Sequence, residues 1–463
     1  MDLTPVAIAL DLGSTRFKGG VLFEDGQLGP IKSVPAPPLV GIGVIREGDP
    51  QAYVEAAEDL LGALLDGLPR GLPLGIASQR SSFLLIDEDG GVPQTSLISW
   101  QDQRAASWCD AHRELEPTVF ARTGLVLSGH YIGPKIAAML EGGGDIAAII
   151  SRPSTRLVTL EGFLAWKLSG GKRHAMDATM AARTSLFDIE SRQWSPTLLE
   201  AFGVPQHLLP EVVQTDGQDT ALRGGLHLKA TIADQAAGAN ASLPGDDGLL
   251  ISLGTGAFLL RGCSDPTERR SGFLTAPILA ADEGRWRHVL EGAISGAGTA
   301  IDRFGAGPTE LPLHDSDAEA FCIPDTAGLG SPHWRADIGF TFSAAARSLP
   351  TADQRRIALE GLLFRVYETA QGLCPAGPPD RILVTGGLAR ETFVIRGLAA
   401  LLGRPIEVLQ LPEAVLLAAG RLAAGMSPDS DVRTDVAEPA AAGRYLGSKY
   451  GAWRTWLRRQ LQG

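Results

Sequence analysis

One pattern, an apolar strand followed by a glycine turn and a second apolar strand, occurs twice in this chain. Residues 6–22 read VAIALDLGSTRFKGGVL, and residues 248–262 read GLLISLGTGAFLLRG. Short apolar runs that flank Gly, Ser and Thr are typical of strands joined by a tight turn. Because one copy opens the chain and the other lies near its middle, the repeat predicts two similar α/β domains.

The length of the chain also favours two domains. The chain has 463 residues, whereas a single hydrophobic core stops growing at roughly 250–300 residues. We place the first domain at residues 1–240 and the second at residues 241–463. A small-molecule site is then expected between the two domains.

Apolar periodicity predicts the other elements. Further strands are expected at 74–78 and 381–385, and residues 83–93 are expected to form a strand that ends in a turn. Helices are expected at 51–67, 102–115, 133–142, 159–168, 196–202, 292–304, 352–371, 390–402 and 413–424. The Pro-, Asp- and Ala-rich segment 427–440 is expected to be a loop. The C-terminal sequence YGAWRTWLRRQLQG is expected to form an amphipathic helix that Trp453 and Trp456 dock on the protein.

Composition excludes several classes of partner. The formal net charge of -12 argues against nucleic acid, whose phosphate backbone needs a basic stripe. The four cysteines are scattered, which favours buried free thiols over a disulfide framework or a zinc site. No apolar stretch is long enough to span a membrane, and the first residues lack the basic start of a signal peptide. We therefore expect a cytoplasmic protein.

Three glycine turns have the composition of phosphate- or nucleotide-binding loops. In the first, Gly13, Ser14 and Thr15 would offer backbone N–H groups and hydroxyls to phosphate oxygens, with Lys18 as a nearby cation. Asp11 at the preceding strand end could hold Mg²⁺ through water. Two further turns follow strands, around Thr255 and at Gly386-Gly387. Taken singly, each turn could equally be an ordinary hairpin or a packing site for a helix, and none is a Walker A loop.

Asp234 is the best candidate for a general base. It lies in TIADQAAGANAS, at the expected junction of a strand and a helix, with small residues and Gln235 beside it. A carboxylate in that position could take the proton of a substrate hydroxyl. The alternative is that Asp234 caps the alanine-rich helix that follows.

Together, these segments resemble the FGGY carbohydrate kinases over nearly the whole chain. The matching segments, in order, are ALDLGSTRFKGGVL (9–22), GIASQRSSFLLIDEDG (75–90), SWQDQRA (99–105), TIADQAAG (231–238), ISLGTGAFLL (251–260), LEGAISGAGTAI (290–301), GLGSPHWRADIGF (328–340), ILVTGGLAR (382–390) and PEAVLLAAGRLA (412–423). The resemblance implies a two-domain, actin-like or ribonuclease-H-like α/β fold with a nucleotide cleft between the domains. It also implies ATP and Mg²⁺ as cofactors, and a small polyol or sugar as the substrate.

The resemblance also assigns roles to residues. Asp234 would be the catalytic base, and Asp11 would coordinate Mg²⁺ through water. The nucleotide would contact residues from both halves of the chain: Ser14, Thr15, Lys18, Gly254 and Thr255 at the phosphates, Gly298 and Asp302 at the base, and Gly386, Gly387 and Ala389 at the adenosine. Phosphoryl transfer of this kind relies on positioning and charge neutralisation.

The substrate pocket resembles that of glycerol kinases, with two departures. By this resemblance it would contain Arg80, Trp100, Asp102, Gln235 and Phe258. Ser81 stands where those kinases have glutamate, and His130, followed by Tyr131, stands where they have tyrosine. Because both missing groups hydrogen-bond hydroxyls and serine leaves space, we expect a four- or five-carbon polyol or ketose.

Several alternatives stay open on the sequence alone. Arg80 could serve an interdomain salt bridge, Trp100 could belong to the core, and His130 could be a plain loop residue. The protein could be a glycerol kinase proper, or a nucleotide-gated binding protein without kinase activity, because a fold does not fix a function. A homodimer is left open, since dimers are common among the relatives while no residue of this chain demonstrates one.

Overall fold

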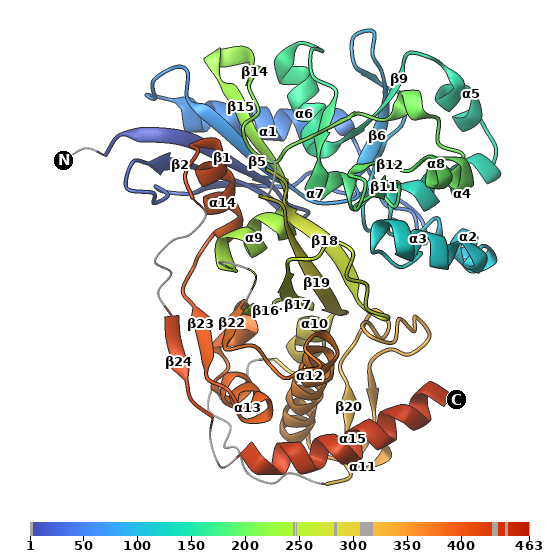
Figure 1. Cartoon of the computed structure of the whole chain (residues 1–463), viewed down its shortest axis with the longest axis vertical. Coiled ribbons are helices and arrows are strands. Elements are labelled where there is room, and N and C mark those ends of the chain that lie inside the picture. Colours follow the sequence, from blue (N-terminus) through green and yellow to red (C-terminus); the bar gives the residue numbers. More distant parts are fainter. Residues whose placement is uncertain are drawn as a thin grey trace.

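The structure is a computed structural model that describes residues 3–243, 246, 248–281, 285–305, 318–427, 434–439 and 443–462. Figure 1 shows two lobes, one above the other, with the first half of the chain in the upper lobe and most of the second half in the lower. Each lobe is built around one large sheet. The two-lobed α/β architecture is the one that the repeated hairpin predicted.

The sheet of the first lobe has six strands in the order β14-β15-β5-β1-β2-β3. Their bounds are β1 Pro5–Leu12, β2 Arg16–Phe23, β3 Lys32–Pro35, β5 Pro73–Ser78, β14 Thr220–Ala221 and β15 His227–Ala233. The middle strands β1, β5 and β15 run parallel to one another. Because the middle of such a sheet is covered on both faces, β1 reads as a nearly continuous apolar run.

Residues of β1 alternate between two apolar cores. Ala7 and Ala9 pack in a cluster that includes α9 (Asp234–Ser242) and α14 (Ala414–Ala423). Ile8 and Leu10 pack in a second cluster with α1 (Pro50–Leu65) and α6 (Leu160–Ser169). Successive side chains of a strand point to opposite faces of the sheet, which explains this alternation. Helix α14 comes from the end of the chain, yet it lies on the sheet of the first lobe (Figure 1).

Smaller elements complete the first lobe. A second sheet contains β4 (Glu47–Gly48), β6 (Phe83–Asp87), β7 (Val92–Pro93), β8 (Leu97–Ile98) and β9 (Thr155–Thr159). Two short strand pairs join β10 (Ala175–Asp177) to β13 (Glu211–Val213) and β11 (Phe187–Asp188) to β12 (Gln193–Trp194). The remaining helices are α2 Ala106–Ala111, α3 Glu116–Thr123, α4 Ile132–Glu141, α5 Ile146–Ser151, α7 Ala178–Ala181 and α8 Pro196–Phe202.

The second lobe has a seven-stranded sheet in the order β18-β19-β17-β16-β22-β23-β24. Its strands are β16 Gly248–Leu253, β17 Ala257–Cys263, β18 Leu274–Leu279, β19 Arg287–Ile294, β22 Arg381–Thr385, β23 Ile406–Leu409 and β24 Thr434–Ala437, with the separate pair β20 (Cys322–Ile323) and β21 (Thr341–Phe342). Its helices are α10 Ala297–Asp302, α11 Ala344–Arg347, α12 Thr351–Leu373, α13 Thr392–Leu402 and α15 Arg444–Gln462.

Trp453 of α15 is fully buried, and its indole N–H donates to Cys322 O at 2.9 Å. The docked C-terminal helix is thus confirmed.

Three predicted elements were partly wrong. The predicted helix at 292–304 is strand β19 up to Ile294, because that segment pairs with β17, and only α10 is helical. The predicted helix at 102–115 is limited to α2 and a 3-10 turn at Arg113–Leu115. Within the predicted loop 427–440, residues 434–437 form β24, which pairs with β23, while residues 428–433 and 440 lie outside the described residues.

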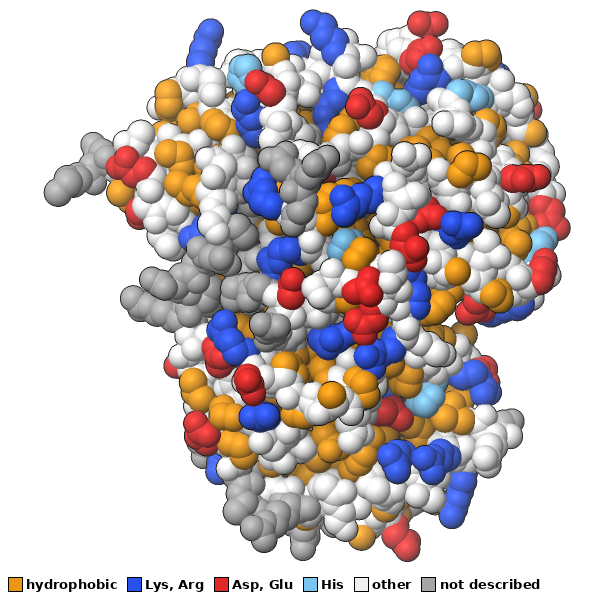
Figure 2. All heavy atoms as spheres, viewed as in Figure 1, with side chains coloured by type: hydrophobic (Ala, Val, Ile, Leu, Met, Phe, Trp, Pro, Cys, Tyr) orange, Lys and Arg blue, Asp and Glu red, His pale blue; other side chains and the backbone are white. Residues whose placement is uncertain are grey.

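Expectations from composition can also be compared with the structure. All four cysteines are buried and free. Within the described ranges, no helix is both long and apolar enough to cross a membrane. Figure 2 shows basic side chains interspersed with acidic ones over the face in view, on both lobes. Charges of both signs therefore share this face.

Candidate active site

Three parallel strands of the first sheet end at the same edge, and each is followed by a predicted site residue. Leu12 of β1 and Ala233 of β15 both pair with Ser78 of β5. The glycine turn follows β1, Arg80 follows β5, and Asp234 follows β15. Ligands of open α/β sheets bind at the carboxyl ends of the strands. The sheet therefore gathers these predicted residues at the edge where a ligand is expected.

The second sheet repeats this arrangement. Strands β16 and β22 are parallel, with Ser252 opposite Thr385, so the turns that follow them share one edge. Gly298 at the start of α10 donates its N–H to Thr255 O at 2.9 Å, and a Cβ at Gly298 would lie 2.0 Å from Gly254 O. Alanine therefore cannot fit at Gly298 without moving the turn.

The remaining predicted nucleotide contacts of this half lie on the same elements. Gly386 follows β22 with φ 101°, and a Cβ there would lie 2.4 Å from Leu253 O. Gly387 and Ala389 belong to the 3-10 turn at Gly387–Arg390. Asp302, the last residue of α10, is exposed.

Asp234 is the first residue of α9, and its side chain faces two arginines. The N-cap of the helix is Ala233, so Asp234 is not the N-cap residue, although its Oδ1 accepts the N–H of Gln235 at 2.7 Å. Arg80 Nε lies 3.9 Å from the same oxygen, and the Asp234 side chain is 36% exposed. Burial raises the pKa of Asp234, and the positive charges of Arg80 and Arg183 oppose part of that increase. A carboxylate with a raised pKa suits a general base.

A hydrogen-bond network fixes the backbone just before Asp234. The N–H of Ala233 donates to Thr179 Oγ1 at 2.9 Å. Thr179 in turn donates to Asp177, whose carboxylate also caps α7. Thr215 donates to the same carboxylate and accepts the N–H of Ala280, which follows β18. The position of Asp234 is therefore tied to strands of both large sheets.

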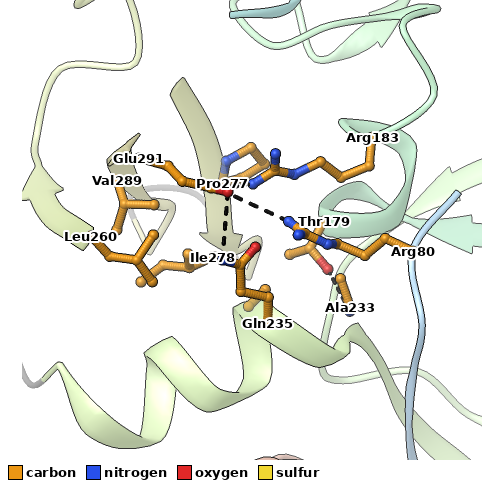
Figure 3. A pocket seen from close by; sticks show the side chains of 11 residues that line it. Arg80, Thr179, Arg183, Ala233, Gln235, Leu260, Pro277, Ile278, Val289 and Glu291 are labelled. Carbon is orange, nitrogen blue, oxygen red and sulfur yellow. Dashed lines mark hydrogen bonds and ion pairs between the residues drawn. The ribbon is translucent and has the colours of Figure 1, made fainter. Parts of the chain in front are cut away.

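A pocket lies at the junction of the two halves, and its lining includes Ala233 and Gln235, the two chain neighbours of Asp234 (Figure 3). The acidic residue of its lining is Glu291 of β19, which forms a buried ion pair with Arg183. Arg80 Nη1 lies 4.0 Å from Glu291, and Gln235 Nε2 donates to Glu291 at 3.5 Å. Burial favours the neutral form of Glu291, but Arg183 and Arg80 hold its pKa below the usual value. Both guanidinium groups thus share one ionised carboxylate.

Arg183 and Glu291 were not among the predicted site residues. Glu291 lies within LEGAISGAGTAI, a segment that carried the family resemblance. A lone acid inside an apolar run was itself a signal, because buried glutamates are rare unless paired. Arg183 is separated from Glu291 by 108 positions, and nothing local in the sequence connects them.

The ring of His130 lies between two other aromatic side chains. It is tilted against Trp100 with centroids 5.5 Å apart and lies edge-on to Tyr131 at 5.1 Å. Burial, together with Lys135, Arg80 and Arg183, holds the pKa of His130 well below its usual value. The imidazole is therefore neutral near pH 7, with one N–H donor and one acceptor. Tyr131 is also buried, and burial raises the pKa of its hydroxyl while Arg183 and Arg80 oppose part of that increase.

Three other predicted substrate residues, Ser81, Asp102 and Phe258, are not among the residues that line the pocket. Ser81 has φ 59° and donates its hydroxyl to Arg183 O at 2.8 Å. Asp102 is fully buried and accepts from Arg46 N at 2.7 Å and Arg104 Nε at 2.8 Å, as a supporting residue would. Phe258 is half-buried on β17, on the same face as the pocket residue Leu260.

Asp11 belongs to a second charged group. It pairs across β1 and β2 with Lys18, whose ammonium donates to both oxygens of Glu413 at 2.9 and 2.8 Å. Burial raises the pKa of Asp11 to about 7, with contributions from Asp234 and Glu413 that Lys18 partly opposes. Glu413 was not predicted.

The charges around Asp11 fit a hydrated divalent cation. The carboxylates of Asp234 and Glu413 both raise the pKa of Asp11, and the ammonium of Lys18 opposes them. No three His, Cys, Asp or Glu side chains within the described ranges converge to form a complete metal cage. Mg²⁺ usually takes one or two carboxylates and fills its shell with water and phosphate oxygens. Asp11 therefore suits that ion.

Comparison with known proteins decides the family. Residues 6–232 match the N-terminal domain of the FGGY family of carbohydrate kinases, and residues 249–426 match its C-terminal domain. The chain belongs to the FGGY family of carbohydrate kinases. It is 31% identical over 442 residues to a glycerol kinase of Thermus brockianus, covering 89% of this chain and 88% of that protein. It is 30% identical over 500 residues to a glycerol kinase of Rhodospirillum centenum, covering 100% and 99%.

Solved structures confirm the actin-like fold of this FGGY kinase. A Plasmodium falciparum glycerol kinase with ADP superposes with a TM-score of 0.87 at 19% identity, covering 99% of this chain and 98% of that one. A ligand-bound xylulose kinase from Lactobacillus acidophilus gives a TM-score of 0.84 at 18% identity, with the same coverage. The family makes the chain an ATP-dependent phosphotransferase, whereas these distant structures show the fold alone.

Proposed function

We propose that this FGGY kinase transfers the γ-phosphoryl group of Mg·ATP to a hydroxyl of a four- or five-carbon polyol or ketose, with Asp234 as the general base. The observation that carries the proposal is the Asp234 carboxylate beside a pocket that Arg80, Arg183 and Glu291 make polar. The two lobes contribute to the pocket together, as expected for a kinase that closes on its substrate.

The chemistry follows from the positions of these side chains. Asp234 takes the proton of the attacking hydroxyl, and Arg80 donates hydrogen bonds to the neighbouring oxygens of the substrate. Lys18 and the turn N–H groups at Ser14 and Thr255 bind phosphate oxygens. Asp11 would hold Mg²⁺ through water, and the ion would neutralise the negative charge of the phosphates. Apolar Leu260, Ile278 and Val289 also line the pocket, and closure of the lobes would exclude water and suppress hydrolysis of ATP.

The charges of the pocket favour an uncharged substrate. Arg80 and Arg183 balance Asp234 and Glu291, and the imidazole of His130 is neutral. An acidic or amino sugar would bring an extra charge with no free partner, and a buried unpaired charge is costly. A neutral polyol or ketose needs hydrogen bonds only, and these side chains supply both donors and acceptors. We therefore prefer it to a sugar acid.

The best test of the function is an assay of ADP release with Mg·ATP. The panel contains glycerol, erythritol, threitol, the pentitols and the common ketopentoses. Turnover that is highest with a four- or five-carbon compound is expected. Turnover with glycerol alone would instead support a glycerol kinase, the alternative that the two relatives at about 30% identity favour. Silence across the panel would direct attention first to acidic or amino sugars, and then to a nucleotide-gated binding protein.

The size preference can be tested through Ser81. Ser81→Glu restores the carboxylate that glycerol kinases are expected to have there, and it should raise kcat/KM for glycerol relative to the best longer substrate by about tenfold. Ser81→Gly is the matched control, because it suits the φ of 59° and removes the same hydroxyl without adding a carboxylate. An unchanged preference in the glutamate variant would remove this segment from the specificity of the site.

The pH profile should show the raised pKa of Asp234. The base must be deprotonated to act, so kcat/KM is expected to fall as the pH drops through a pKa above the usual range for aspartate. The profile should be recorded at saturating Mg²⁺, because the bound cation keeps Asp11 ionised. An acid limb at or below the ordinary aspartate range would contradict the assignment.

We also propose that the enzyme works in the cytoplasm. The four buried free cysteines support this, because unpaired thiols persist in reducing compartments.

A further inference from the structure

The ion pair between Lys18 and Glu413 connects two segments that are 395 positions apart. Lys18 lies on β2, next to the turn expected to bind phosphate. Glu413 directly precedes α14, the helix from the end of the chain that packs on β1 and β5. The pair therefore brings a carboxylate from the last part of the chain to the edge where Asp11 and Asp234 lie.

The backbone at Glu413 is strained. It has φ 55° and ψ 40°, the left-handed region that residues other than glycine rarely adopt. The side chains of Lys18 and Glu413 are 33% and 31% exposed, and ion pairs this accessible add little to stability. A strained backbone that places a carboxylate on a half-exposed lysine suggests a role in the site.

The register of the sheet indicates what Glu413 does. Asp11 and Lys18 are direct partners across the antiparallel strands β1 and β2, so their side chains point to the same face. An ammonium in that position would be expected to pair with the Asp11 carboxylate. Within the described part of the chain, the ion pair of Lys18 is instead with Glu413, and no ion pair joins Lys18 to Asp11.

We propose that Glu413 is a positioning residue that holds the Lys18 ammonium away from Asp11, leaving the Asp11 carboxylate open to a hydrated divalent cation bound with the nucleotide. This inference rests on the proposed function. Without the Glu413 carboxylate, Lys18 turns onto Asp11 and competes with the cation. Lys18 also loses the position from which it reaches the phosphates.

The first experiment measures Mg·ADP binding by calorimetry, without a sugar, and the KM for Mg·ATP where turnover is found. Glu413→Gln should weaken Mg·ADP binding and raise that KM by about tenfold, the size of effect that outer-shell partners of metal sites show. The kcat at saturating Mg·ATP should change much less, because the loss is in binding. Glu407→Gln is the matched control, since Glu407 forms a comparable half-exposed pair with Arg381 on the neighbouring strand.

A double-mutant cycle separates this role from a structural one. In a Lys18→Met background there is no ammonium to hold, so adding Glu413→Gln should cause no further loss of Mg·ADP binding. Losses that multiply, or a Glu413→Gln variant that binds like the wild type, would overturn the proposal. Glu413→Gly, which suits the left-handed backbone, should reproduce the loss. If Glu413→Gly binds Mg·ADP normally, the loss in Glu413→Gln comes from the backbone at the start of α14 and not from the missing carboxylate. That result would also overturn the proposal.

Failure of this inference can be told apart from failure of the proposed function. If the wild-type protein releases no ADP with any polyol or ketose, the proposed substrate class is wrong. The calorimetric cycle still measures the role of Glu413 in that case, because it uses Mg·ADP alone. A wild-type protein that does not bind Mg·ADP at all would overturn this inference as well.

Discussion

Asp234→Asn is expected to lower turnover by at least about a hundredfold, the usual scale for loss of a general base. The amide keeps the shape of the side chain and can still accept the N–H of Gln235, so α9 should begin as it does now. Asparagine cannot accept the proton of the attacking hydroxyl. Affinity for Mg·ATP should stay close to that of the wild type, since the role proposed for Asp234 is toward the substrate hydroxyl.

The measurement is steady-state ADP release with the best substrate of the panel, together with calorimetric binding of the nucleotide. Asp219→Asn is the matched control, because Asp219 is an exposed aspartate paired with His227 and Lys229 away from the pocket. It should retain full turnover. If Asp234→Asn retains turnover too, Asp234 serves the start of α9 only, and the proposed mechanism fails.

The positions of Asp11 and Asp234 could be predicted from the sequence because Asp11 lies near the end of a short apolar strand and Asp234 directly follows another. Arg80 follows the strand predicted at 74–78, and the family resemblance assigned its role. Strand ends of one parallel sheet meet at one edge whatever the rest of the chain does. The same local logic placed the turns around Thr255 and Gly386. In all these cases, the sequence pattern that predicts the position lies within a few residues of it.

Arg183 and Glu413 could not be predicted because their partners lie far away in the chain. Arg183 meets Glu291 only when the two lobes assemble, and Glu413 reaches Lys18 only when α14 packs on the first sheet. The prediction of a helix at 292–304 was partly wrong for a related reason. Its small and apolar residues suit either helix or strand, and pairing with β17 extends the strand to Ile294.

Arg183→Met should destabilise the folded protein strongly. Arg183 and Glu291 are both buried, with 6% and 2% of their surfaces exposed. Removing one partner of a buried ion pair leaves the other charge uncompensated and costs about 3–5 kcal/mol. Arg80, at 4.0 Å from Glu291, offsets part of this, so we expect a loss near the lower end of that range.

The matched control is Arg122→Met, which removes a 55%-exposed arginine from its pair with Asp188 and should cost no more than about 1 kcal/mol. Urea denaturation of both variants at pH 8 and at pH 5 gives the test. Without Arg183, burial should raise the pKa of Glu291, so the carboxylate takes up a proton as the pH falls. The loss of stability in Arg183→Met should therefore be larger at pH 8 than at pH 5. Equal losses in the two arginine variants, or a loss independent of pH, would mean that Glu291 is not held ionised by Arg183. The polar character of the pocket would then need a different explanation.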